Sequence, residues 1–383
     1  MGVVKRFVLL AVIASASAVG GAEYPLIVFR LTDSPVRSPE FFKASCEVHA
    51  KYKGAFDEFW YGGGQPLCKI EVCREDLKKM AALRPWVEKA GMRLSFQQGL
   101  TTGHDYAYVG KPGKQAAAGV YASEEAEPFP DDAWMVRKNG EQATGRCLCP
   151  RSPAVLDYEY RFVKATLEEL HPVTYWLDDD LRLGVGKVGC FCPRCLAAFN
   201  RKAGTALTRD ALVKRLFEGA ELDPLRLEWI TFNEESLALY GRAARKAADE
   251  VMPACRLALQ TVSADCLLNG RDYAPILREL SANGRVPAGL RPGHGCYRED
   301  RPLDFLEKAL WCTREAERSR RLGNLCGTVC YEEETYTRRV LHKSPNAIVT
   351  EAALALASGC DTVSFYWADG EKPERIEDYE RFV

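Results

Sequence analysis

The sequence predicts a (β/α)8 barrel, and three observations lead to this prediction. Eight apolar runs of strand length alternate with longer segments of helical period, an alternation typical of a parallel sheet with crossover helices. The composition, 47% hydrophobic and 27% charged, is that of a globular domain with a large core. The glycine-rich GxGxxG motif, which would favour a doubly wound open sheet, does not follow the first predicted strand.

The predicted elements follow one another in strand and helix order. The strands span 24–32, 55–61, 92–98, 173–179, 256–263, 286–291, 325–332 and 361–367. The helices span 39–52, 73–90, 153–170, 222–250, 271–283, 302–322 and 345–358, with a last short helix at 373–383. Helix 153–170 illustrates the reasoning, because Ser152 can cap its first turn and Pro153 fits the first helical position. Ser344 and Pro345 begin the seventh helix with the same chemistry.

The amino terminus has the pattern of an export signal. Lys5 and Arg6 precede the apolar run 7–19, and small residues follow it, which predicts a secretory signal peptide over 1–22. The run is shorter than the roughly 20 residues that a membrane span needs, and a buried helix is the alternative. The mature chain, 23–383, is therefore expected to be secreted or periplasmic, without a membrane span. Its balanced charge, 52 Lys and Arg against 53 Asp and Glu, argues against a nucleic-acid partner.

Acidic residues follow the fourth predicted strand. Two long connections, 99–151 and 180–221, leave the carboxyl ends of strands, where barrel enzymes build their active sites. The second begins in WLDDDLRL, which brings Asp178, Asp179 and Asp180 to this rim, followed by Arg182. Strand alternation directs Asp178 and Asp180 to one side and Asp179 to the other. An acidic loop that caps a helix or pairs with Arg182 is the structural alternative.

The seventh predicted strand ends in a second acidic run, CYEEETY, with Glu332, Glu333 and Glu334 at the same rim. A carboxylic acid on one strand and a carboxylate on another are the equipment of glycoside hydrolysis. One group protonates the leaving oxygen, while the other attacks the anomeric carbon or activates water. Alternation puts Glu332 and Glu334 on one side and does not choose between them. A solvated helix start is the alternative for Glu333.

Other polar and aromatic side chains near the strand ends are candidates for substrate binding. Aromatic rings cover the apolar face of a sugar, and sugar hydroxyls need hydrogen-bonding partners. The candidates are Asp178, Arg182, His104, His294, Tyr297 and Trp367. Trp176, in the fourth strand, is more typical of a barrel core.

Clustered cysteines predict a metal site. Cys190, Cys192 and Cys195 lie within six residues, as CFCPRC, too close together for all three to bond one another. Cys149, just before helix 153–170, can complete a closed, structural zinc site of four thiolates, and no organic cofactor is expected. Cys147 is an alternative fourth ligand, and disulfide pairing within the cluster is an alternative in an exported chain.

Three segments resemble the family-42 glycoside hydrolases, most of which are β-galactosidases with a clan-A barrel. CPRSP at 149–153 is similar to the family's Cys-Pro-x-Ser-Pro before its third helix. CFCPRCLAAFN at 190–200 looks like its cysteine cluster and the following Phe-containing helix. GCDTVSFYW at 359–367 is similar to its eighth strand. The resemblance implies zinc bound by Cys149, Cys190, Cys192 and Cys195.

The resemblance also implies roles for the carboxylates. The family's general acid/base, a Glu after an Asn, falls on Asp180, with Asp179 in place of the Asn. Asp is one methylene shorter, and a displacement of about 1 Å can cost roughly 100-fold in rate. The family's nucleophile falls on Glu332 or, with a two-residue shift, on Glu334. Its later trimerisation and β domains have no counterpart in these residues, so either the barrel ends abruptly or the chain is part of a longer one.

Three functions follow from these observations. The first is an exported glycosidase that uses Asp180 and Glu332 or Glu334 in a two-carboxylate, retaining mechanism. The second is a catalytically inactive barrel that binds carbohydrate. The third is a hydrolase that holds a divalent metal with Asp178, Asp180 and a seventh-strand Glu. The residues leave open the sugar, the linkage and whether the chain forms a homo-oligomer.

Overall fold

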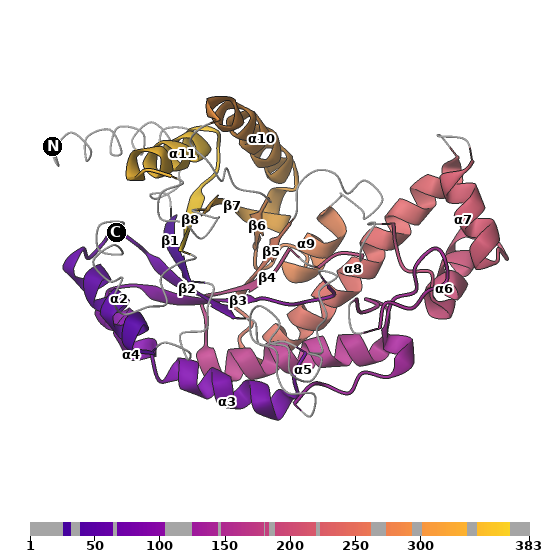
Figure 1. The fold of residues 1–383 in the computed structure, drawn as a ribbon, viewed down its shortest axis with the longest axis horizontal. Helices are drawn as coiled ribbons and strands as arrows, with labels where there is room; N and C mark the ends of the chain where they lie inside the picture. Colours follow the sequence, from indigo (N-terminus) through magenta and orange to yellow (C-terminus); the bar gives the residue numbers. More distant parts are fainter. Residues whose placement is uncertain are drawn as a thin grey trace.

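The computed structural model describes residues 26–31, 39–63, 67–103, 125–144, 147–179, 181–183, 188–219, 223–261, 273–292, 301–334 and 343–367. It confirms the predicted barrel, because parallel strands pair in sequence order and β8 closes the sheet against β1 (Figure 1). The strands are β1 Leu26–Leu31, β2 Glu58–Gly63, β3 Arg93–Gln98, β4 Thr174–Leu177, β5 Arg256–Gln260, β6 Ala288–Arg291, β7 Cys326–Glu334 and β8 Thr362–Trp367.

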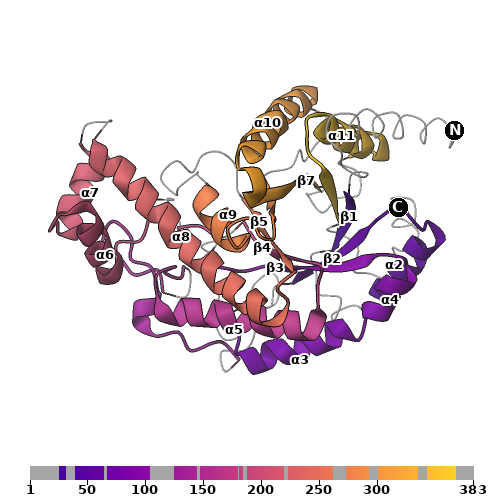
Figure 2. The ribbon, with the colours of Figure 1, turned by 180° about the vertical axis from the view of Figure 1, so that it is seen from behind.

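Helices surround this barrel or extend away from it. They are α2 Pro39–Lys51, α3 Ile70–Ala81, α4 Arg84–Lys89, α5 Pro153–Leu170, α6 Pro193–Ala203, α7 Arg209–Phe217, α8 Pro224–Val251, α9 Ala274–Leu280, α10 Pro302–Arg321 and α11 Pro345–Ala357. α5 packs against both α3 and α8, whereas α10 and α11 lie on the opposite side of the barrel (Figures 1 and 2). α6 and α7 lie beside the amino-terminal half of α8, away from the barrel.

Two helical predictions needed correction. The single helix expected at 73–90 is two helices, α3 and α4, because Pro85 lies in the first turn of α4. Proline offers no backbone N–H and disfavours the helical conformation of the residue before it, so a helix rarely continues through such a position. α7 was not predicted, although the Thr208 side chain accepts a hydrogen bond from Ala211 N as a helix cap does.

Two tryptophans fill the barrel interior. Trp60 of β2 and Trp176 of β4 stack with ring centroids 4.6 Å apart and an interplanar angle of 22°, and both are buried. β5 and β6 contribute small residues at this level: a Cβ added to Gly289 would lie 2.9 Å from the Ala258 Cβ and 3.2 Å from the Trp176 ring. The large pair fits because its neighbours are small, and Trp176 is a core residue, as predicted.

Residues 67–69, just before α3, are fixed by contacts with two distant segments. Cys68 forms an antiparallel bridge with Ala126, near the middle of the long connection after β3. Tyr158 of α5 accepts a hydrogen bond from Leu67 N at 2.7 Å and donates one to the Cys68 carbonyl at 2.8 Å. Leu67 has a φ of +74°, a left-handed conformation that costs about 1–3 kcal/mol in a residue with a side chain. These contacts hold Leu67 in a strained conformation.

Acidification is expected to destabilise the protein through His49 of α2. The ring packs 4.9 Å from both Phe29 and Phe56, and burial lowers the pKa of His49 from 6.5 to about 3. A folded-state pKa below the unfolded value means that the unfolded chain takes up the proton first, so stability falls with pH below about 6.5. Between pH 7 and pH 5 this should cost about 2 kcal/mol.

Urea unfolding at both pH values measures this loss. We expect His49→Phe to reduce the difference in unfolding free energy between the two, whereas a His171→Asn variant, changed at an exposed histidine at the end of α5, should keep the wild-type difference. An unchanged difference in His49→Phe would refute the assignment.

Some predicted segments lie outside the described residues, among them the signal peptide at 1–22 and the helix at 373–383. Within the described ranges, no helix combines the length and apolar character needed to cross a membrane.

Candidate active site at the carboxyl ends of the strands

Glu332 lies inside the barrel near the end of β7, between two arginines. Its Oε2 is 2.9 Å from Arg291 Nη1, and its Oε1 pairs with Arg30 Nη1. All three side chains are at most 7% exposed. The Arg30 guanidinium also lies 5.2 Å from the Trp60 ring centroid and 4.9 Å from that of Tyr366. Two guanidinium groups therefore stabilise Glu332 as a carboxylate and fix its position.

Arg291, the last residue of β6, joins the two acidic strand ends. Its Nε donates to Gln260 Oε1 at 3.0 Å, its Nη1 contacts Glu332, and its Nη2 lies 3.5 Å from Asp179 Oδ2. The fixed fork of a guanidinium can hold two carboxylates at once. Arg291 thus brings a carboxylate that follows β4 and one at the end of β7 to one centre, although the predicted partner of Glu332 was Asp180, which lies outside the described residues.

The side of Asp179 differs from the prediction. Alternation along β4 directed Asp178 and Asp179 to opposite sides, yet Asp178 Oδ1 accepts a hydrogen bond from Gln97 of β3 at 2.8 Å and Asp179 reaches Arg291. β4 ends at Leu177, so the two-residue period no longer applies beyond it. Both aspartates contact residues at the ends of barrel strands.

The other predicted substrate-binding residues have different outcomes. Arg182 links the two long connections through its backbone, because Arg182 N donates to Thr102 Oγ1 at 3.0 Å and Thr102 Oγ1 donates to the Arg182 carbonyl at 2.7 Å. The side chains of Glu334 and Trp367 lie outside the described residues, although their backbones belong to β7 and β8. Outside them entirely lie Asp180, His104, His294 and Tyr297.

Glu333 lies on the outer face of β7, where the surrounding helix packs against it. It is buried, so it is not the solvent-exposed start of a helix that was considered as an alternative. It is 0% exposed and accepts a hydrogen bond from Lys343 Nζ at 2.6 Å. Lys343 also pairs with Glu351 of α11, which accepts a hydrogen bond from the Tyr331 hydroxyl. Burial disfavours the charged form of Lys343 and acts to lower its pKa. The negative charges of Glu333 and Glu351 act more strongly in the opposite direction, so the pKa of Lys343 is raised above its usual value. The ion pairs of Lys343 with Glu333 and Glu351 fix the outer side of β7 next to Glu332.

Loss of the Lys343 charge is expected to destabilise the protein strongly. Lys343→Met leaves two buried carboxylates without their shared cation, and breaking a buried pair in this way costs about 3–5 kcal/mol. Urea unfolding measures the effect. Lys79→Met is the matched control, since Lys79 is 58% exposed and pairs with Asp76 at 3.0 Å, and such pairs contribute about 1 kcal/mol or less. Equal losses in the two variants would contradict the assignment.

Sequence reasoning missed the arginines and amides of this centre. Arg30, Gln97, Gln260 and Arg291 stand at or near the ends of β1, β3, β5 and β6. The sequence does mark these four positions. Each is a polar residue in an otherwise apolar run, and it stands an even number of residues from other inward-facing positions of its strand.

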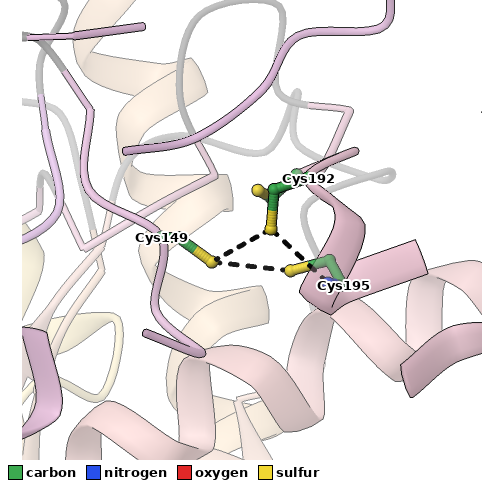
Figure 3. Close-up of side chains that lie close together, drawn as sticks. Cys149, Cys192 and Cys195 are labelled. Atoms are coloured by element: carbon green, nitrogen blue, oxygen red, sulfur yellow. Dashed lines mark hydrogen bonds between the residues drawn. The ribbon is translucent and has the colours of Figure 1, made fainter. Parts of the chain in front are cut away.

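The four predicted cysteines form one cluster. Cys149, Cys190, Cys192 and Cys195 are buried, with sulfur atoms all within 4.8 Å of one another. Figure 3 shows Cys149 facing Cys192 and Cys195, at Sγ distances of 3.8 and 3.5 Å. Thiolates about 2.3 Å from a tetrahedral metal ion lie roughly 3.8 Å apart, so the donor set fits a metal ion. Cys147 is not part of the cluster.

Local structure explains why these thiols converge. Cys192 caps α6, and its sulfur accepts a hydrogen bond from Cys195 N at 3.4 Å. Hydrogen bonds from Cys149, Cys190 and Cys195 lower the pKa of Cys192, and a helix amino terminus favours a thiolate. The cluster ties the end of one long connection to the other. Among the described residues it is the only group with metal-ligand spacing, while Asp180, required by the divalent-metal hypothesis, lies outside them.

Comparisons with known proteins bear on the fold. No family model and no curated protein matches the sequence. Among solved structures, the chain is similar to the catalytic domain of β-amylase from Paenibacillus polymyxa, with 11% identity and a TM-score of 0.60 over 94% of this chain and 99% of that one. It is also similar to the PgaB (BpsB) glycoside hydrolase domain from Bordetella bronchiseptica, with 12% identity and a TM-score of 0.57 over 94% of this chain and 99% of that one.

A third structure, a variant of the GH42 β-galactosidase Gan42B from G. stearothermophilus, matches with 13% identity and a TM-score of 0.56. The match covers 94% of this chain but 56% of the β-galactosidase, so the chain spans just over half of that protein. At these identities the similarity establishes a shared barrel architecture.

Proposed function

We propose that this protein is a glycoside hydrolase that cleaves glycosidic bonds with carboxylates at the carboxyl ends of β4 and β7. The observation that carries the proposal is the centre in which Arg291 contacts both Asp179 and Glu332. The structurally similar barrels include a β-amylase, a glycoside hydrolase domain and a β-galactosidase, which supports the same class of reaction.

In the proposed mechanism each carboxylate has one role. Glu332, held as an anion by two arginines, attacks the anomeric carbon or stabilises its developing positive charge. The acid that protonates the leaving oxygen comes from the fourth strand, and the family resemblance assigns it to Asp180. Water completes the retaining cycle, with the same aspartate acting as base. Glu334 is the alternative nucleophile.

The cysteine cluster supports a further part of the proposal, a structural zinc ion. Four thiolates leave no open position, so the ion would stabilise the long connections and take no part in the reaction. We also propose that the protein is exported, on the strength of the signal-peptide pattern at 1–22.

One observation favours a second function, carbohydrate binding without catalysis. Both carboxylate oxygens of Glu332 are engaged by arginines, and the side chain is 3% exposed. A nucleophile must reach its substrate, so an arrangement that stays closed would bind a sugar without cleaving it.

A substrate screen tests the proposal. The full chain is incubated with chromogenic aryl glycosides and with oligosaccharides of both anomeric configurations, while calorimetry measures binding of the same sugars. Turnover with retained anomeric configuration supports the proposed hydrolase. Binding without turnover supports the second function. Turnover that a chelator of divalent cations abolishes and that added magnesium, calcium or manganese restores would support divalent-metal hydrolysis.

A further inference from the structure

Cys68 and Cys73, around the start of α3, bring their sulfur atoms to 2.7 Å. Both side chains are 0% exposed. This separation is shorter than the 3.5 and 3.8 Å between thiols of the metal cluster. Within the described residues no third cysteine, histidine or carboxylate joins the pair to complete a metal-binding group. The pair therefore requires an explanation other than a metal.

The backbone holds the two cysteines in place. Cys68 is fixed by its bridge to Ala126 and by the Tyr158 hydroxyl, which donates to its carbonyl. Cys73 N donates to the Lys69 carbonyl at 3.0 Å, so Cys73 belongs to the first turn of α3. The strained Leu67 immediately precedes the pair. A covalent link at this point would help to hold the strained conformation, because such conformations persist only where their surroundings over-determine them.

We infer that Cys68 and Cys73 form a disulfide bond in the exported protein. The inference rests on the contact geometry and on export to an oxidising compartment, and it is independent of glycoside hydrolysis. The bond forms by exchange with an oxidant disulfide, such as oxidised glutathione. One cysteine thiolate attacks the oxidant and releases one thiol; the second cysteine then attacks the mixed disulfide and releases the other. Two S–H bonds are lost, one S–S bond forms, and the oxidant disulfide is reduced to two thiols.

The bond would stabilise the contact between the residues before α3 and the long connection after β3. Residues 67–69 pair with 125–127, near the middle of the long connection after β3. Lys69 N donates to the Glu125 carbonyl, and Glu127 N donates to the Leu67 carbonyl. Because both thiols are buried in the folded chain, the bond must form before or during folding. It then holds the connection after β2 against the connection after β3.

Peptide mapping tests the inference directly. The full chain is produced by export, denatured, alkylated with iodoacetamide without reduction, and digested with trypsin. Cleavage after Lys53, Lys69 and Arg74 places Cys68 in peptide 54–69 and Cys73 in peptide 70–74, each with one cysteine. We expect the two peptides to be linked, and to separate only after reduction. Alkylation of both cysteines, or a link from either one to another cysteine, would overturn the inference.

A variant pair gives an independent readout. In the exported wild type, unfolding and refolding in the presence of reductant should accelerate hydrogen exchange at Leu67, Lys69 and Glu127. The Cys68→Ser/Cys73→Ser double variant should exchange quickly with or without reductant. Cys255→Ser, altered at a buried cysteine elsewhere, should behave as wild type. If unfolding and refolding in reductant, followed by reloading of the metal ion, leaves exchange at these amides unchanged in the wild type, the pair carries no such bond. Failure of the double variant to fold leaves the peptide mapping as the deciding measurement.

Discussion

Replacing Glu332 with glutamine is expected to lower kcat on any glycoside that the wild type cleaves by about 1,000-fold or more. Glutamine preserves the size of the side chain but removes the negative charge that faces Arg30 and Arg291. The variant can neither attack the anomeric carbon nor stabilise its positive charge. Initial rates on the best substrate of the screen measure the effect, and circular dichroism checks that the barrel is folded.

Two further variants make this prediction specific. Glu88→Gln, at a side chain that is 64% exposed, should keep wild-type kcat. Glu332→Gly should recover turnover when azide is added, because a small anion can enter the vacated space and act as the nucleophile. If Glu332→Gln retains wild-type kcat, Glu332 is not the nucleophile. The same test on Glu334 then decides whether the seventh strand supplies one at all.

Removing one cysteine of the cluster is expected to release the metal ion and to destabilise the protein by at least about 3 kcal/mol. Cys149→Ser leaves three thiols, and serine is a poor ligand for zinc. Because the cluster joins the two long connections, the first regions to lose protection from hydrogen exchange should be 147–152 and 188–203, ahead of the barrel strands. Elemental analysis measures the metal, and thermal unfolding measures the stability.

Cys147→Ser is the matched control for this prediction. Cys147 is buried two residues from Cys149 but is not in the cluster, so the variant should keep its metal ion. Metal loss should also occur as the pH falls, since protons compete with the ion for the thiolates. A chain purified with no bound metal at neutral pH, or a Cys149→Ser variant that binds as much metal as the wild type, would contradict the proposal.

The fold could be predicted because its determinants are local. Strand-length apolar runs and helix starts such as Ser152 with Pro153 depend on neighbouring residues, and α5 begins and ends where the sequence predicted. The break between α3 and α4 was equally local and could have been inferred from Pro85. The cysteine cluster was predictable because metal ligation restricts both residue type and spacing.

The candidate site was less predictable, because its contacts join residues far apart in the sequence. Nothing near Arg291 indicates that it contacts Gln260, Asp179 and Glu332 at once. The register of the barrel determines those contacts, and register follows from packing around the whole sheet. Asp179 illustrates a second limit: alternation applies within a strand, and the position at which β4 ends was not available from the sequence.

The stacked tryptophans affect how substrate could enter the barrel and how product could leave it. Trp60 and Trp176 pack with Cys330 inside the barrel, two residues before Glu332 on β7, so among the described residues the barrel is filled on that side and a substrate would reach Glu332 from the rim. If the protein is a hydrolase, the product must leave by the route through which the next substrate arrives. A product retained at the mouth would then compete with substrate, and turnover would slow as product accumulates even while substrate remains abundant.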